Sequence, residues 1–146
     1  MAGEKGNKHS QLLLAAIFQA VFTAITGLLA NAASPDTNLY VSLHTADPGA
    51  GGSQTTSEAA YTGYARVAVP RTTGGWSLSA ETISNVGAIT FPACTAGSET
   101  ETWFGIGTDP TGVGNLLYAG PLTAGLAVSA GITPSFAAGA LTVTEG

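Results

Sequence analysis

The residues with the greatest capacity for chemistry are His44 and Asp47, which lie close together in the sequence. An imidazole beside a carboxylate can act as a general base or bind a metal, and Asp36, Glu58 and Glu81 are candidate further carboxylates. However, His44 falls on the polar side of an alternating strand, and Asp47 opens an Asp-Pro-Gly turn, where its side chain bonds the backbone. No spacing supplies a full set of metal ligands. We therefore predict no catalytic, metal or cofactor-binding residue, and no enzyme activity.

Two glycine-rich stretches, Gly105-Ile106-Gly107 and Gly112-Val113-Gly114, have the look of phosphate-binding loops. Neither completes the dinucleotide fingerprint, and neither precedes an amphipathic helix. Glycines of this kind are typical of turns and bulges. We therefore predict that the two stretches bind neither a nucleotide cofactor nor a small-molecule substrate.

The aromatic residues Trp76, Trp103, Tyr61 and Tyr64 are the candidates for lining a sugar-binding groove. Aromatic packing beneath a loop or at an interface is the commoner use of such residues. The sequence leaves both uses open.

Three further residues carry charge or a thiol. Arg66 and Arg71 flank one predicted strand, and we expect them to form ion pairs with Glu58 or Glu81. Cys94 is the one cysteine of the chain, so no intramolecular disulfide can form, and we expect a buried thiol.

The charge content is the most informative feature of the composition. Charged residues make up 9% of the 146 residues, against roughly 25% in an ordinary soluble domain. From Pro110 to Thr144 the chain has no charged residue, and the mean hydropathy is +0.29. Because so neutral a surface protects poorly against association, we expect other subunits to cover much of it. The net charge of −5, with no basic stripe, argues against nucleic acid as a partner.

The first 36 residues divide into a polar arm, 1–9, and an apolar packing helix with its linker, 10–36. Ser10 is a suitable N-cap, Leu12–Ala30 is apolar, and Ser34-Pro35 ends the run. A signal peptide is disfavoured because the run exceeds a usual h-region, and a membrane span because polar residues interrupt it. We favour a long helix buried against neighbouring subunits. Its predicted interface residues are Leu14, Ile17, Phe18, Val21, Phe22, Ile25, Leu28 and Leu29.

Residues 37–146 are predicted to form a β domain. In Asn38–Thr45, Leu39, Val41 and Leu43 alternate with polar or aromatic residues, the pattern of a half-buried strand. A long polar loop follows over 49–63. Short strands separated by Gly/Pro turns indicate an antiparallel sandwich or barrel. The candidates are Tyr64–Pro70, Thr82–Phe91, Thr102–Thr108, Asn115–Ala119, Leu126–Ser129, Ile132–Phe136 and Leu141–Thr144.

Over about residues 38–146 the amino-acid sequence resembles a family of small virion structural proteins of tailed bacteriophages. The segments that carry the resemblance are LYVSLHTADPG (Leu39–Gly49), SEAAYTGYARVAVPR (Ser57–Arg71), ITFPACTAGSET (Ile89–Thr100), WFGIGT (Trp103–Thr108), GNLLYAG (Gly114–Gly120) and GITPSFAAGALTVTE (Gly131–Glu145). Such proteins are labelled as tail fibres or resemble head decoration proteins. The chain departs from the family in its more apolar N-terminal helix.

Two virion functions follow from the resemblance. The first is a capsid decoration, or cement, protein that binds as a trimer between major capsid subunits and stabilises the head through many small interfaces. The alternative is a tail-fibre or tail-tip component involved in host attachment. Composition favours the first, on the capsid surface, with the protein itself and the major capsid protein as partners.

Overall fold

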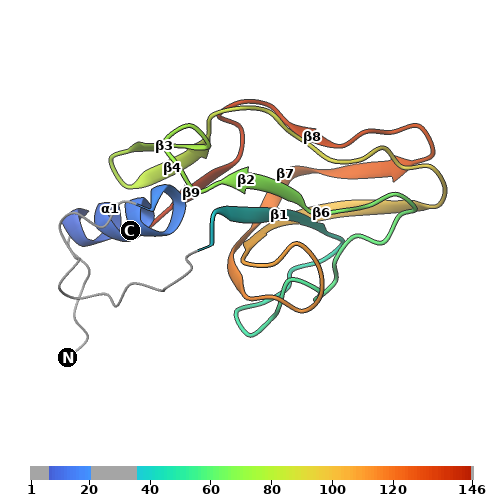
Figure 1. The fold of residues 1–146 in the computed structure, drawn as a ribbon. Coiled ribbons are helices and arrows are strands. Elements are labelled where there is room, and N and C mark those ends of the chain that lie inside the picture. The colour runs from blue at the N-terminus through green and yellow to red at the C-terminus, as the bar shows by residue number, and fades with distance from the viewer. Residues whose placement is uncertain (1–6, 21–35, 146) are drawn as a thin grey trace. The chain divides into compact units, whose positions relative to one another are not determined.

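The computed structural model describes residues 7–20 and 36–145 of the chain. The chain forms two compact units, in each of which the residues mainly contact one another (Figure 1). The first unit combines Met1–Thr37 with Pro70–Ala88 and Ala137–Gly146, and the second combines Asn38–Val69 with Ile89–Phe136. Each unit is therefore discontinuous in sequence.

The helix of the first unit is shorter than predicted. Helix α1 covers Asn7–Gln19, so it begins before the predicted cap at Ser10 and includes part of the predicted arm. Ala20 adopts a left-handed φ of 54°, which a right-handed helix cannot continue through. The long helix predicted from the apolar run is therefore wrong as far as the described residues go, and its part beyond Ala20 lies outside them.

A small antiparallel sheet completes the first unit. Its strands are β3 (Trp76–Ser79), β4 (Thr82–Asn85) and β9 (Thr142–Thr144), in the order β3-β4-β9. Helix α1 lies against β3 and β4 (Figure 1). Phe18 meets Trp76 edge-on with ring centroids 4.7 Å apart, and both are fully buried. The core of this unit thus depends on apolar burial between the helix and the sheet.

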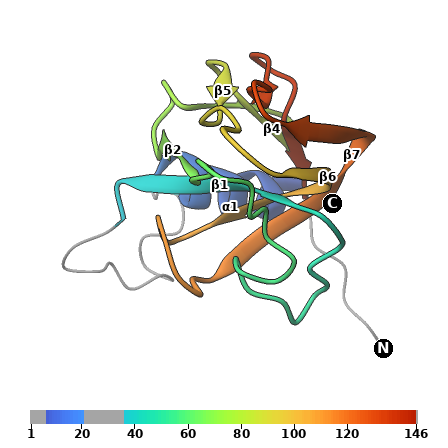
Figure 2. The same ribbon diagram turned by 90° about the vertical axis from the view of Figure 1, so that its right-hand side faces the viewer.

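The second unit contains a larger antiparallel sheet. Its order is β2-β1-β6-β7, with β1 at Asn38–His44, β2 at Val67–Pro70, β6 at Ser98–Gly107 and β7 at Leu116–Ser129. Strand β6 lies between β1 and β7, and its register with β7 shifts between Glu101 and Trp103 and again between Ile106 and Gly107. Figure 2 shows β1, β6 and β7 as neighbours. The order leaves β7 at one edge of the sheet.

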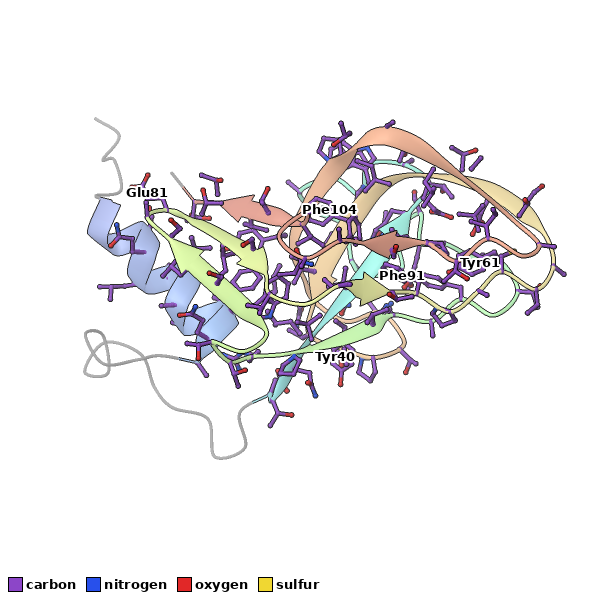
Figure 3. All side chains as sticks on the ribbon, turned by 90° about the horizontal axis from the view of Figure 1, so that it is seen from above. Tyr40, Tyr61, Glu81, Phe91 and Phe104 are labelled. Carbon is purple, nitrogen blue, oxygen red and sulfur yellow. The ribbon has the colours of Figure 1, made fainter. Side chains whose placement is uncertain are left out.

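A two-stranded pair, β5 (Ile89–Thr90) with β8 (Ser135–Phe136), adds an aromatic cluster to this unit. Phe136 packs edge-on against Phe91 and Phe104, at centroid distances of 6.1 and 6.2 Å. Figure 3 labels Phe91 and Phe104 in this region. Aromatic pairs in this geometry stabilise a core beyond their area alone.

The prediction of a mainly β, antiparallel chain with an N-terminal helix is confirmed in outline. No helix in the described part of the chain is long and apolar enough to cross a membrane. Packing of the sheets as a sandwich or barrel stays a prediction.

Candidate interaction surfaces

The segment that follows β1, drawn cyan to green in Figure 2, covers one face of the large sheet. The Thr45 N–H donates to Ser57 O at 2.8 Å, and the Ala59 N–H donates to Leu43 O at 2.9 Å. Ser42 and His44 are therefore buried, although the alternation had placed them on a polar face. The prediction of an exposed polar face on this strand is wrong because the loop packs onto it.

His44 is a structural residue in this segment. Its Nδ1 lies 2.8 Å from Thr56 O, and its Nε2 lies 2.8 Å from the Ser42 hydroxyl. A carbonyl can only accept, so Nδ1 carries the proton, and Nε2 of the neutral ring accepts from Ser42. Burial lowers the pKa of His44, although the Thr56 carbonyl and the Glu58 carboxylate act in the opposite direction. Both ring nitrogens are thus used within the fold.

Glu58 pairs with Arg66, as expected from the sequence. The guanidinium Nε lies 2.6 Å from Glu58 Oε1, and Nη2 lies 2.8 Å from Oε2. The Tyr64 hydroxyl donates to Glu58 Oε1 at 3.0 Å and accepts the Leu43 N–H at 3.1 Å. Burial raises the pKa of Tyr64 well above its ordinary value, so its hydroxyl stays protonated. The Arg66 side chain is only 2% exposed, which makes this pair an internal one.

Gln54 joins this segment to the turn before β7. It is fully buried, accepts the Asp109 N–H at 3.0 Å and donates to Asp109 O at 3.3 Å. A Cβ on Gly107 or Gly114 would overlap the Gln54 side chain. The two glycine-rich stretches therefore serve close packing and the turn, where Gly112 and Gly114 have φ of 75° and 50°.

The carboxylates proposed around His44 do not form a metal site. Asp47 Oδ1 accepts the Gly49 N–H at 2.8 Å, which is the predicted turn contact. Asp36 and Glu81 belong to the first unit, with Glu81 at the turn between β3 and β4 (Figure 3). Within residues 7–20 and 36–145, no three His, Cys, Asp or Glu side chains gather closely enough for a metal.

The four aromatic candidates separate in the structure. Trp76 is buried against α1, and the Tyr61 hydroxyl donates to Pro92 O at 2.9 Å (Tyr61 is labelled in Figure 3). Tyr64 belongs to the Glu58 network. Trp103 lines a hollow.

This hollow, hereafter the aromatic hollow, has a volume of about 230 Å³. Trp103 comes from β6, Tyr118 and Leu117 from β7, and Asp47 and Gly49 from the turn after β1. Sequence reasoning missed Tyr118, because nothing in its surroundings marks it except its place in a strand. Burial raises the pKa of Tyr118.

Strand β7 presents a second surface, its outer edge. Over its 14 residues its hydrogen-bonded neighbour in the described part of the chain is β6 alone. Its sequence contains no charged residue. An apolar hollow of about 210 Å³ lies along its middle, lined in part by Leu122, Leu126, Phe91 and Phe136. Unpaired edges without charges are templates for pairing with another strand.

The predicted helix interface is described only in part. Leu14 and Phe18 are fully buried in the first unit, and Ile17 is half-buried. The remaining five, Val21, Phe22, Ile25, Leu28 and Leu29, lie outside the described residues. Contact of this helix with other subunits stays a prediction.

Glu101 is the most unusual titratable group. It is fully buried on β6, where its ionised carboxylate finds no hydrogen-bond donor within the described residues, whereas its protonated form can donate to Glu99. Burial, with the nearby Glu99 as the next cause, raises the pKa of Glu101 to about 8. Glu99 itself accepts the N–H groups of Ala60 and Tyr61, each at 2.8 Å. Sequence reasoning missed the burial of Glu101, because this residue lies in a strand with charged and polar neighbours.

With this geometry in place, comparison with known proteins gives one family. The family described as podophage GP4 fiber I protein gp80 matches residues 9–144 of the chain. No curated protein matches it.

Proposed function

The chain belongs to the family of the podophage GP4 fiber I protein gp80, a family of tailed-phage virion structural proteins, and from this premise we propose that it is a fibre component involved in host attachment. The observation that carries the proposal is the extent of the family match, which includes residues 9–144. The chain's own chemistry agrees with a structural role. His44, Glu58 and Arg66 are internal, where they hold a loop rather than face a substrate.

The fibre description favours the second of the two virion functions over the capsid decoration protein that composition had favoured. Both functions share a passive mechanism, which depends on multivalent contacts and not on catalysis. They differ in position and copy number. A decoration protein covers the shell in hundreds of copies, whereas a fibre component is present at low copy number on the tail.

Localisation therefore tests the proposal. Antibody–gold labelling of intact virions, with the copy number from quantitative mass spectrometry, is expected to give few copies on fibres. Purified protein added before infection is expected to reduce phage adsorption, with bovine serum albumin as the control. Label spread over the head, at hundreds of copies per particle, would instead establish capsid decoration.

Self-association through the outer edge of β7 is the second part of the proposal, with a second copy of this chain as the partner. The support is that β7, 14 residues long and devoid of charge, has β6 as its one neighbour among the described strands and lies beside an apolar hollow. Two identical edges can pair antiparallel about a two-fold axis, which makes the contact self-complementary. The strand has no lysine or glutamate to oppose such pairing.

Light scattering on size-exclusion fractions tests this contact. Ala127 is exposed on β7, and Ala127→Lys is expected to convert the oligomer to monomer because it adds a charge to both of the pairing edges. Ala68→Lys, on the opposite edge strand β2, is the matched control and is expected to leave the oligomer intact. A monomeric wild type, or equal behaviour of the two variants, contradicts the β7 contact.

A further inference from the structure

We propose that the aromatic hollow binds one neutral sugar ring, with Trp103 as the stacking surface and Asp47 as the hydroxyl acceptor. The biological setting, a fibre that contacts the carbohydrate of a host surface, rests on the function proposed above. The binding itself rests on the residues of the hollow and can be measured on the isolated chain.

The size of the hollow limits the ligand. Its volume of about 230 Å³ lies below the roughly 300–1,000 Å³ of sites for drug-sized molecules. Its walls come from the turn after β1, drawn cyan to green in Figure 1, and from the first residues of β7, drawn orange. A single ring, presented at the end of a longer chain that leaves the site, suits this space.

Trp103 and Leu116 supply the apolar contact, whereas the register places the Tyr118 side chain with Ile106 on the other face of the sheet. Trp103 lies opposite His44 on one side and Pro121 on the other, so its backbone is fixed in the middle of the sheet. Its side chain is half-buried, which leaves part of it accessible. An indole ring offers a large rigid surface at low entropic cost, onto which the C–H face of a sugar can stack.

Asp47 supplies polar recognition and sets the charge of the ligand. Its Oδ1 accepts the Gly49 N–H at 2.8 Å, which orients the carboxylate. A carboxylate has about four acceptor positions, so capacity remains for two adjacent sugar hydroxyls. Neither lysine nor arginine lines the hollow. Acidic sugars and phosphates would therefore meet a carboxylate without a compensating cation.

The turn that carries Asp47 is already ordered by its own contacts. The Gly52 N–H donates to Gly49 O at 3.0 Å, and Gly52 sits so close to the Pro48 carbonyl that a side chain would overlap it. Two residues further on, the Gln54 N–H donates to Val113 O at 3.0 Å. A wall fixed in this way loses little conformational entropy when a ligand binds, which favours measurable affinity for a small ring.

The test uses the purified full-length chain and a panel of free neutral sugars (glucose, galactose, mannose, rhamnose and N-acetylglucosamine), observed by saturation-transfer NMR and titrated by chemical shift. At least one is expected to bind with a millimolar dissociation constant. Trp103→Ala is expected to weaken it by about tenfold or more. Tyr40→Ala, which alters a half-buried aromatic residue of β1 outside the hollow, is the matched control and should bind as wild type.

Asp47→Asn separates charge from structure, because asparagine can keep the turn contact to the Gly49 N–H. This variant is expected to lose several-fold in affinity for neutral sugars. If Trp103→Ala fails to fold, Trp103→Phe, which retains a smaller ring, is expected to bind more weakly than wild type. In the wild type, the NMR signals whose chemical shifts change on sugar binding must also include those of Asp47, Gly49 and Tyr118.

Three results would overturn the proposal: no neutral sugar binds, binding is unchanged in Trp103 and Asp47 variants, or only glucosamine or choline binds, which would indicate a cation site. If the protein is located on fibres but binds no sugar, the proposed sugar site is refuted and the fibre function is not. If the protein binds a sugar but antibody labelling places it on the head, the fibre function is refuted and the proposed sugar site is not.

Discussion

The guanidinium of Arg66 and the carboxylate of Glu58 form a two-point ion pair inside the second unit, with N···O distances of 2.6 and 2.8 Å. Arg66 also donates to Asp109 O at 2.8 Å and to Gly112 O at 2.7 Å. Hydrogen bonding to Glu58 is the largest cause that raises the pKa of Arg66. One side chain thus connects the segment after β1 to the turn before β7.

Removal of Arg66 should therefore destabilise the protein. Arg66→Met leaves the Glu58 carboxylate, 14% exposed, without its cation, and breaking such a pair typically costs about 3–5 kcal/mol. Urea unfolding measures the loss. The double variant Arg66→Met/Glu58→Leu removes both charges and is expected to recover part of it. A single variant that loses less than about 1 kcal/mol would show that solvent replaces the pair.

Gly107 should tolerate no side chain. The Cβ of Gly107→Ala would overlap Gln54, which is buried and held at both ends of its amide by Asp109. Overpacking of this kind costs about 1–3 kcal/mol. Gly51→Ala is the matched control, because no atom lies within 4 Å of its added carbon. Denaturant midpoints that shift equally for both variants contradict the close packing of Gln54 on β6.

These glycines also explain where sequence reasoning failed. The alternation in β1 correctly predicted Leu39, Val41 and Leu43 as buried. It could not reveal that the glycines of β6 let a loop pack on the other side. Likewise Pro121 and the glycines of β7 predicted two short strands, whereas a single strand forms. A proline is compatible with an edge strand, whose outer N–H groups need no partner in the sheet.

Other errors arise from tertiary contacts that local patterns do not encode. The apolar run at the N-terminus correctly predicted a helix but not its end at Gln19. Of the site residues, the turn contact of Asp47 and the pairing of Glu58 with Arg66 were predictable from residue type and spacing. Trp103 and the first residues of β7 line one hollow only because β6 pairs with β7, a long-range relationship without a local signal.

Glu101 should give the protein a distinctive dependence on pH. Its pKa rises from an ordinary 4.5 to about 8 on folding. Between these values the folded state keeps a proton that the unfolded state releases, so the stability contribution is full below pH 4.5 and is lost as pH rises toward 8. The slope approaches about 1.4 kcal/mol per pH unit. Glu101→Gln should remove this component.

The measurement for Glu101 is the free energy of unfolding of wild type and Glu101→Gln between pH 4.5 and pH 8. The variant is expected to gain relative to wild type as pH rises. His44 has a lowered pKa and loses stability in the opposite direction, as pH falls, but it contributes equally to both proteins. Parallel stability curves would mean that Glu101 ionises normally in the folded protein.

Arg71 should stabilise the first unit through the end of α1. Its Nε donates to Ile17 O at 2.7 Å, Nη2 to Ala16 O at 2.9 Å, and Nη1 to Asp36 O at 2.7 Å. Carbonyls near a helix C-terminus lack helical partners, and a cation there also opposes the helix dipole. Arg71→Met is therefore expected to cost about 1.5–3 kcal/mol. Arg71→Lys, with a single point charge, should retain less than half of the contribution.

Hydrogen exchange distinguishes this effect from a general loss of stability. In Arg71→Met, amides of α1, β3 and β4 are expected to exchange faster, because these elements share the first unit. Amides of β1 and β6, in the second unit, should keep their protection, whereas Arg66→Met should show the reverse pattern. If both variants accelerate exchange uniformly, the two units unfold as one cooperative structure, and the capping contacts contribute to the stability of the whole chain.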